Sequence, residues 1–366
     1  MSGSITGKIL KVSTWGESHG AAIGAVLDGC PAGLTIDEEY IQAFLDRRKP
    51  GQSRFTTHRN EKDKVRILSG VFEGKTTGTP ISLMIENTDH RSADYSNIKD
   101  IVRPGHADYC FNEKYGIRDY RGGGRSSGRE TAGRVMAGAV AVRLLSELGI
   151  EFLTYVDSVG DISINEDCFD ESFIKENPLC MPDRDAYEKA SAYLDELMKA
   201  GDSSGASVKC IIKNVPVGIG ETVFDKLDAR LAGAIMSIGA VKAVEIGDGT
   251  AVAAARGSVN NDEFYSEEGN VLKKTNHSGG ILGGMSDGSD IIIKASFKPT
   301  PSIYSEQATV DKDGNNVNIN IKGRHDPIVA PRAAVVVETM TALVVADLML
   351  SNMSSKLENV LKIYNR

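Results

Sequence analysis

Two short turns carry histidines beside other polar side chains, an arrangement that suits proton transfer. The first turn is Gly16-Glu17-Ser18-His19-Gly20, between two strand-like segments, and the second is Arg103-Pro104-Gly105-His106-Ala107-Asp108. An imidazole titrates near neutral pH, so it can donate or accept a proton during a reaction. Taken alone, the first turn fits an ordinary hairpin with a solvated histidine better, and the second fits a salt-bridged loop equally well.

A third segment, Arg121–Arg129, has the residue types of an anion-binding loop. It reads RGGGRSSGR and runs directly into a long apolar stretch. Glycines let backbone N–H groups approach an anion, and a helix N-terminus adds a favourable partial charge. The segment lacks the GK[ST] of a Walker A loop. We predict a phosphate or carboxylate cradle rather than an RNA-binding RGG segment, because RGG segments are repetitive and disordered.

Three more segments could line a site. Gly323–Pro327 reads GRHDP and precedes a second apolar stretch, and its Asp326 could act as a base or cap the following helix. Thr275–Gly284 and Lys298–Ser302 predict rigid turns, although turn chemistry alone would explain them. The histidine and cysteine spacings do not suit zinc, so no metal is expected.

Short strands and a few helices must position these segments. Arg129–Leu148 and Pro331–Leu350 are apolar nearly all round, which is typical of helices inside a structure. Each of these apolar stretches follows a Gly-Arg loop. The single domain 1–366 is therefore either internally duplicated or not, and the sequence favours neither alternative. Amphipathic patterns predict helices at 37–47 and Asp185–Ala200. Alternating patterns predict strands at Gly7–Val12, Ala22–Leu27, Val65–Phe72, Ile81–Glu86, Ser207–Val215, Ala240–Ile246, Asp290–Ser296 and Val317–Ile321.

The composition is that of a globular protein with an uneven charge distribution. Of 366 residues, 41% are hydrophobic and 25% charged, which argues against disordered, collagen-like and coiled-coil classes. The net charge of −8 argues against a dedicated nucleic-acid binder. Residues 45–134 nevertheless hold 18 Lys/Arg, 12 of them arginine, against 12 Asp/Glu. That stretch fits either a pocket for a small polyanion or solvated surface charge.

Cysteine usage and hydropathy indicate the compartment. The five cysteines are scattered without a CxxC pair, which favours free thiols in a reducing environment. Met1–Leu10 does not look like a secretory leader. Charged residues interrupt both of the most apolar stretches, so we expect no membrane span and a soluble, cytoplasmic protein.

Seven motifs, in order and spread from about Gly7 to Leu350, resemble the chorismate synthase family. They are GESHGAAIGAVLDGCPAG, DRRKPGQSRFTTHR, RPGHAD, GGGRSSGRETAGRVMAGAVA, NHSGGILGG, KPTPSI and GRHDPIVAPRAAVVVETM. The resemblance implies an α+β fold, a β-α-β sandwich whose central helices are enclosed by antiparallel sheets with an internal pseudo-twofold. It also implies a lyase that eliminates phosphate from 5-enolpyruvylshikimate-3-phosphate, 1,4-anti, to give chorismate with the help of reduced FMN.

The resemblance also assigns roles residue by residue. His19 matches the histidine thought to protonate the departing phosphate, His106 the one thought to protonate the reduced flavin, and Asp326 the carboxylate thought to accept a proton at flavin N5. The substrate-binding positions are Ser18, Arg48, Arg54, Arg103, Arg129 and Arg324. The flavin-binding positions are Arg125, Ser126, Ser127, Gly239, Ala240, Gly283, Lys298, Pro299, Thr300, Pro301, Ser302 and Arg324. Gly239 departs from the asparagine that many members have there.

Other properties follow only from the resemblance. Arg48 and Arg54 also match positions assigned to NADP, so NADPH could serve as an indirect reductant. Members form homotetramers, and we expect this chain to depend on an external flavin reductase. The alternatives are an NADPH-using flavin reductase on the same scaffold, and an RNA-binding module that uses RGGGR.

Overall fold

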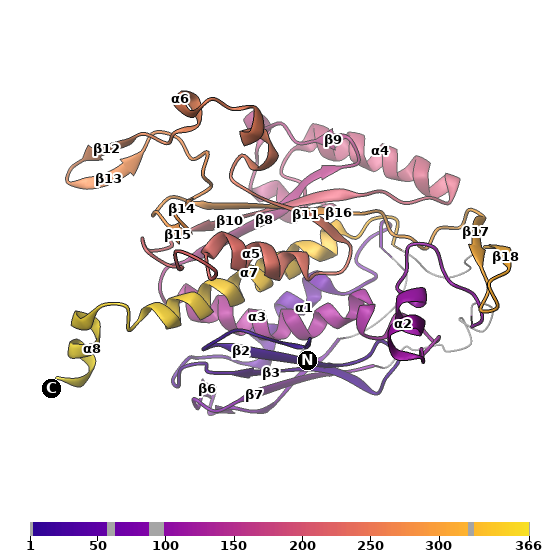
Figure 1. Ribbon diagram of the computed structural model, residues 1–366, viewed down its shortest axis with the longest axis horizontal. Helices are drawn as coiled ribbons and strands as arrows, with labels where there is room; N and C mark the ends of the chain where they lie inside the picture. Colours follow the sequence, from indigo (N-terminus) through magenta and orange to yellow (C-terminus); the bar gives the residue numbers. More distant parts are fainter. Residues whose placement is uncertain (1–2, 57–62, 88–98, 321–325, 366) are drawn as a thin grey trace.

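Two five-stranded antiparallel sheets enclose a layer of helices (Figure 1). The computed structural model describes residues 3–56, 63–87, 99–320 and 326–365. The first sheet has the order β1 (Ile5–Thr6), β2 (Lys11–Gly16), β3 (Ala22–Asp28), β7 (Ile81–Glu86) and β4 (Val65–Ser69). The second has the order β11 (Val241–Ile246), β16 (Ile291–Phe297), β10 (Ala206–Lys213), β8 (Glu151–Val159) and β9 (Ile162–Ser163).

The helical layer contains α1 (Glu38–Arg48), α3 (Thr131–Ser146), α5 (Leu227–Met236) and α7 (Ala330–Asn352). The centre of this layer is the contact between α3 and α7, both of which are buried along most of their length. A Cβ atom on Gly138 would lie 2.4 Å from Cβ of Thr339, so only glycine allows the two helices to approach so closely. The apolar faces of both sheets cover this pair, which explains why neither helix has a polar face.

Further helices and hairpins surround the sandwich (Figure 1). The helices α2 (Asp108–Tyr115), α4 (Arg184–Ala200), α6 (Gly257–Asn260) and α8 (Leu357–Tyr364) lie outside the central layer. The described residues also form four two-stranded hairpins, namely β5 (Val71–Phe72) with β6 (Lys75–Thr76), β12 (Phe264–Glu267) with β13 (Asn270–Lys273), β14 (Ile281–Leu282) with β15 (Met285–Ser286), and β17 (Gln307–Val310) with β18 (Asn316–Ile319). The hairpin β17–β18 and α2 lie at one end of the molecule, and β12–β15 and α8 at the other.

The α+β sandwich predicted from the sequence is confirmed, with local corrections. The predicted strand Gly7–Val12 is wrong at its start, because β2 begins only at Lys11. The carboxylate of Asp347, buried in α7, instead accepts the backbone N–H groups of Lys8, Ile9 and Leu10 at 2.8–3.0 Å. The predicted strand Val65–Phe72 is interrupted at Gly70. Strand β8 and helix α5 were not predicted, the end of Val317–Ile321 lies outside the described residues, and the internal duplication stays a prediction.

Helix α7 is long and apolar enough to cross a membrane, with a mean hydropathy of 1.9, but 89% of its most apolar window is buried inside the structure. Two acidic residues interrupt it, and both are paired within the protein. Glu338 receives two hydrogen bonds from Arg47 at 2.6 and 2.8 Å, and Asp347 receives one from Arg230 at 2.8 Å. These contacts are those of a core helix that packs between two sheets.

Candidate active site

The turn that carries His19 joins β2 to β3 and is held by backbone contacts. Its Gly20 amide donates to the Glu17 carbonyl at 3.0 Å. The His19 ring lies against Gly122 of the glycine-rich loop, where a Cβ would stand 2.5 Å from Cδ2 of the ring. The turn spells G-x-S-x-G, but it links two strands rather than a strand to a helix, so it is not a hydrolase nucleophile elbow.

A continuous set of hydrogen bonds leads from this turn to two of the predicted substrate arginines. The Asn87 amide donates to the carbonyls of Glu17 at 2.9 Å and Gly20 at 2.7 Å. Its Oδ1 accepts Nε of Arg129 at 2.6 Å, and Nη1 of Arg129 reaches Asp63 at 2.7 Å. Asp63 also pairs with Nη2 of Arg48. Strand ends, α1 and the loop before α3 therefore meet at one buried polar cluster.

This cluster is cationic and almost closed to solvent. The side chains of Asp63, Arg48 and Arg129 are 0%, 2% and 7% exposed. Burial alone would raise the pKa of the Asp63 carboxyl, but the two guanidinium groups hold it below its usual value. Among the described residues, the buried Nε of Arg48 and Oγ of Ser18 have no hydrogen-bond partner. Buried donors of this kind suit an anionic ligand.

Asp326 is connected to the same cluster. Its carboxylate pairs with Nη1 of Arg332, whose Nε donates to the Arg48 carbonyl at 2.8 Å. Helix α7 begins at Ala330 with Val329 in the capping position and no side-chain cap. The prediction that Asp326 could cap this helix is therefore wrong, and its role as a proton acceptor stays open.

His106 belongs to a second group, in which both of its ring nitrogens are hydrogen-bonded. Its Nδ1 lies 3.0 Å from the Pro104 carbonyl, which can only accept, so this nitrogen carries the proton. Its Nε2 then accepts the Ser302 hydroxyl at 2.9 Å. Burial, assisted by the charge of Arg103, lowers the pKa of His106 below its ordinary value.

The lowered pKa of His106 predicts an acid-sensitive contribution to stability. The folded state binds this proton less readily than the unfolded chain, whose histidine titrates near about 6.5. Wild-type stability should therefore fall as the pH decreases from about 6.5 through the folded pKa. We expect His106→Gln to lose less stability than the wild type over that window, as measured by thermal midpoints at stepped pH. Equal acid sensitivity of the two proteins would show that folding does not lower the pKa of His106.

The predicted KPTPS turn and Gly239–Ala240 lie beside His106. Because β11 pairs with β16, the Lys298 amide reaches the Ala240 carbonyl at 2.9 Å. The Lys298 ammonium group donates to the Gly105 carbonyl at 2.7 Å. Burial and the neighbouring charge of Lys242 lower the pKa of Lys298. The Lys298 ammonium group thus contacts the loop that carries His106.

The two groups are joined by the loop that precedes β10. The Ser204 amide donates to the Pro327 carbonyl at 2.9 Å, and the Ser203 hydroxyl donates to the Thr300 carbonyl at 2.7 Å. Asp326 and the KPTPS turn therefore belong to one region of the fold. This region includes α2 and the loops next to β17–β18, at one end of the molecule (Figure 1).

Three predicted residues are not brought into this region by the described structure. Arg54 is 59% exposed and pairs with Asp195 of α4 at 3.0 Å. Gly283 lies in the β14–β15 turn at the opposite end of the molecule (Figure 1). Arg324 lies outside the described residues.

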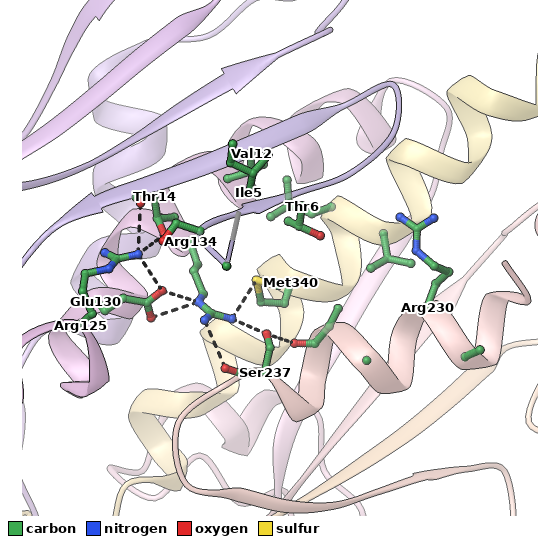
Figure 2. A pocket seen from close by; sticks show the side chains of 17 residues that line it. Ile5, Thr6, Val12, Thr14, Arg125, Glu130, Arg134, Arg230, Ser237 and Met340 are labelled. Carbon is green, nitrogen blue, oxygen red and sulfur yellow. Dashed lines mark hydrogen bonds and ion pairs between the residues drawn. The ribbon is translucent and has the colours of Figure 1, made fainter. Parts of the chain in front are cut away.

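In the predicted anion-binding loop Arg121–Arg129, polar groups that were expected to face a ligand form hydrogen bonds with one another. The Ser126 hydroxyl donates to the Gly123 carbonyl at 2.7 Å, and the Ser127 hydroxyl accepts the Arg129 amide at 3.3 Å. Arg125 lines a pocket of about 360 Å³ between β2, α5 and α7, where it donates to Thr14 Oγ1 at 2.6 Å (Figure 2) and to the Gly16 carbonyl at 3.1 Å. Glu130 already places a carboxylate at the start of α3. The helix terminus is thus partly neutralised by the protein itself.

Comparisons with known proteins assign the family. A chorismate synthase family model matches residues 10–350. The chain belongs to the chorismate synthase family. It is 63% identical to the chorismate synthase of Lachnoclostridium phytofermentans and 60% identical to that of Agathobacter rectalis, each over 100% of both chains. A crystal structure of chorismate synthase matches with a TM-score of 0.76 and 33% identity, covering 98% of this chain and 97% of the other.

The family membership confirms the predicted enzyme class. Chorismate synthases are lyases of aromatic amino acid biosynthesis, and the α+β sandwich agrees with the solved relative. The roles of individual residues stay predictions. Sequence reasoning did not find Asp63, Asn87 and Arg332, which connect the predicted residues to one another. Arg332 lies within the last motif and Asp63 lies shortly after DRRKPGQSRFTTHR, whereas Asn87 directly follows a predicted strand and is in no motif.

Proposed function

We propose that the chain converts 5-enolpyruvylshikimate-3-phosphate to chorismate and inorganic phosphate by a 1,4-anti elimination, the last step of the shikimate pathway. The main support is the hydrogen-bonded cluster that links the His19 turn, Arg129, Arg48 and Asp326. This substrate carries two carboxylates and a phosphate. Buried guanidinium groups provide charge-assisted hydrogen bonds to such groups.

Reduced FMN is the proposed cofactor, and the residues near His106 are compatible with it. The Lys298 ammonium group, the Ser302 hydroxyl and the Ala240 backbone lie together. Thr300 Oγ1 is buried and has no hydrogen-bond partner among the described residues, so it could serve a bound ligand. A reduced flavin supplies the electron density that departure of an allylic phosphate requires. The family-derived assignments of Arg125, Ser126, Ser127, Gly239, Gly283, Pro299, Pro301 and Arg324 to the flavin remain part of this proposal.

The chain's own groups would then hold and move protons. His19 lies beside Gly122. The pKa of the Asp119 carboxyl is lowered mainly by its hydrogen bond with Arg121, and the nearby charge of His19 contributes to the same shift. Its imidazole would supply a proton to the departing phosphate oxygen. His106, whose Nε2 is hydrogen-bonded to the Ser302 hydroxyl, would supply a proton to the reduced flavin, and the Asp326 carboxylate would accept a proton. Arg48, Arg103 and Arg129 would bind the anionic groups of the substrate.

The remaining family properties are also part of the proposal. Burial of Arg48 against Asp63 suits substrate binding better than contact with NADP. The exposed Arg54 could contact either ligand. We further propose a homotetramer, dependence on an external flavin reductase, and a cytoplasmic location, which the five free cysteines favour.

Turnover with chemically reduced flavin tests the proposed reaction. The purified chain should form chorismate under argon with dithionite-reduced FMN, and should form none in air with oxidised FMN and no reductant. Consumption of NADPH in the absence of substrate, without chorismate formation, would favour the flavin reductase alternative. Chorismate formation without any flavin would reject the proposed cofactor.

A further inference from the structure

Three of the predicted substrate arginines form ion pairs with two buried aspartates. Asp63 pairs with Arg48 and lies 2.7 Å from Arg129, and Asp108 lies 2.7 Å from Arg103 and 2.8 Å from Arg118. The two aspartate side chains are 0% and 5% exposed. The same arrangement, one carboxylate shared by two guanidinium groups, thus occurs twice.

Asp63 joins two segments that are far apart in the sequence, and Asp108 joins the segments on either side of one helix. Arg48 ends α1, whereas Arg129 lies in the turn that precedes α3. Arg103 precedes α2 and Arg118 follows it, while Asp108 is the first residue of that helix. A carboxylate between two such segments fixes the relative orientation of their arginines.

The backbone at Asp63 adds an independent observation. Its φ angle is +42°, a conformation that residues other than glycine rarely adopt. The surrounding structure must over-determine such a conformation for it to persist. The contacts recorded at Asp63 are those of its carboxylate with the two arginines and that of its carbonyl, which accepts the Gln42 amide at 3.2 Å.

Each aspartate can accept hydrogen bonds from only some of the N–H groups of its two arginines. An arginine has five N–H donors, and an aspartate has two acceptor oxygens. Arg48 contacts Asp63 through Nη2, and its buried Nε has no partner among the described residues. The group formed by Asp63, Arg48 and Arg129 carries a net positive charge, which suits one further anion.

We propose that Asp63 and Asp108 are positioning residues, which orient Arg48, Arg129 and Arg103 so that these arginines bind the anionic groups of the substrate. This assignment rests on the proposed function and adds two residues that need not touch the substrate. The competing explanation is that both aspartates are only structural ion-pair partners. Buried pairs of that kind are common and contribute to stability when complete.

Asparagine variants separate the explanations, because charge and geometry predict opposite effects. Asp63→Asn removes a negative charge near the anion site, so electrostatics alone would strengthen substrate binding. If Asp63 positions the arginines, the variant should instead raise KM about ten- to hundredfold, since one charge-assisted contact becomes an amide facing a guanidinium donor. We expect the same direction for Asp108→Asn, with kcat changed much less than KM.

The measurement combines steady-state kinetics with direct binding. Kinetics use dithionite-reduced FMN, and calorimetry measures the Kd of 5-enolpyruvylshikimate-3-phosphate on the protein with oxidised FMN. Asp170→Asn is the matched control, because Asp170 also pairs with an arginine, Arg184 at 3.3 Å, in an exposed location. Its KM and Kd should equal those of the wild type.

Each outcome bears on the proposal. A raised KM and Kd for both site variants, with the control unchanged, supports it. An unchanged or lowered KM and Kd, with only the melting temperature reduced, would overturn it and leave structural ion pairs. If Asp63→Asn does not fold, Asp63→Glu replaces it, since a longer carboxylate keeps the charge but shifts the arginines. A wild-type KM in Asp63→Glu would equally overturn positioning, whereas failure of the wild type to bind or convert the substrate would reject the proposed function instead.

Discussion

His19→Ala is expected to lower kcat by about 10²–10⁴, the usual contribution of a positioned acid or base. The imidazole lies at the His19 turn, against the glycine-rich loop and next to the arginine cluster. The fold should survive, because the turn is closed by the backbone bond from Gly20 to Glu17 and by the Asn87 amide, and none of these contacts involves the imidazole. Rate measurements with reduced FMN and saturating substrate give kcat, and thermal unfolding reports the fold.

His277→Ala is the control for this prediction. His277 pairs with Asp248 at 2.6 Å near the end of β11 that is remote from Ala240, away from the proposed site. Its replacement should leave kcat within a factor of two or so of the wild type. If His19→Ala turned over at the wild-type rate, another group would have to protonate the departing phosphate.

The parts of the site that were predictable from sequence are those with local causes. Glycine-flanked histidines and the Gly-Arg loops before apolar stretches depend on turn chemistry and helix periodicity, both of which act over a few residues. The His19 turn, the Gly-Arg loop and the helices α3 and α7 accordingly occur where the patterns place them. The start of β2 was misplaced because a distant residue, Asp347, takes the amides that a strand would have used.

The connections within the site were not predictable, since they depend on tertiary pairing. Asp63 lies in a segment with several charges, and nothing in its neighbours marks it as the partner of Arg48 and Arg129. Arg48 and Arg54 are six residues apart and looked equivalent. The last turn of α1 buries Arg48, whereas Arg54 follows the helix and stays exposed. Burial, which decides what an arginine can bind, therefore became visible only in the fold.

Strand β8 was missed for a similar reason. Its sequence contains Asp157 in the middle of an apolar run, which weakens the strand pattern. In the sheet this carboxylate meets Lys294 of β16 at 2.7 Å and the Ser207 hydroxyl of β10 at 3.1 Å. A charged residue is tolerated within a sheet when other strands of that sheet supply its partners. Pattern rules that treat each segment alone cannot include those partners.

Asp326→Asn is expected to lower kcat by about 10²–10⁴ with little change in KM, because an amide cannot accept a proton as a carboxylate does. The thermal midpoint should change little. The structure removes the competing role of a helix cap, since Val329 occupies the capping position of α7. The structure shows a different competing role, in which Asp326 pairs with Arg332. The Nε atom of Arg332 also donates to the Arg48 carbonyl. If Asp326 acted only through that pair, the variant would raise KM and lower the midpoint while kcat stayed near the wild-type value.

A second variant and a control make this distinction sharper. Arg332→Lys keeps the positive charge beside Asp326 but loses the Nε contact to Arg48, so it should affect KM more than kcat. Asp225→Asn disrupts a carboxylate–arginine pair on Arg230 at 3.1 Å, outside the proposed site, and should leave both constants unchanged. A low kcat in Asp326→Asn together with a normal kcat in Arg332→Lys would identify the carboxylate itself as the proton acceptor. Wild-type kcat in Asp326→Asn would assign the acceptor to another group.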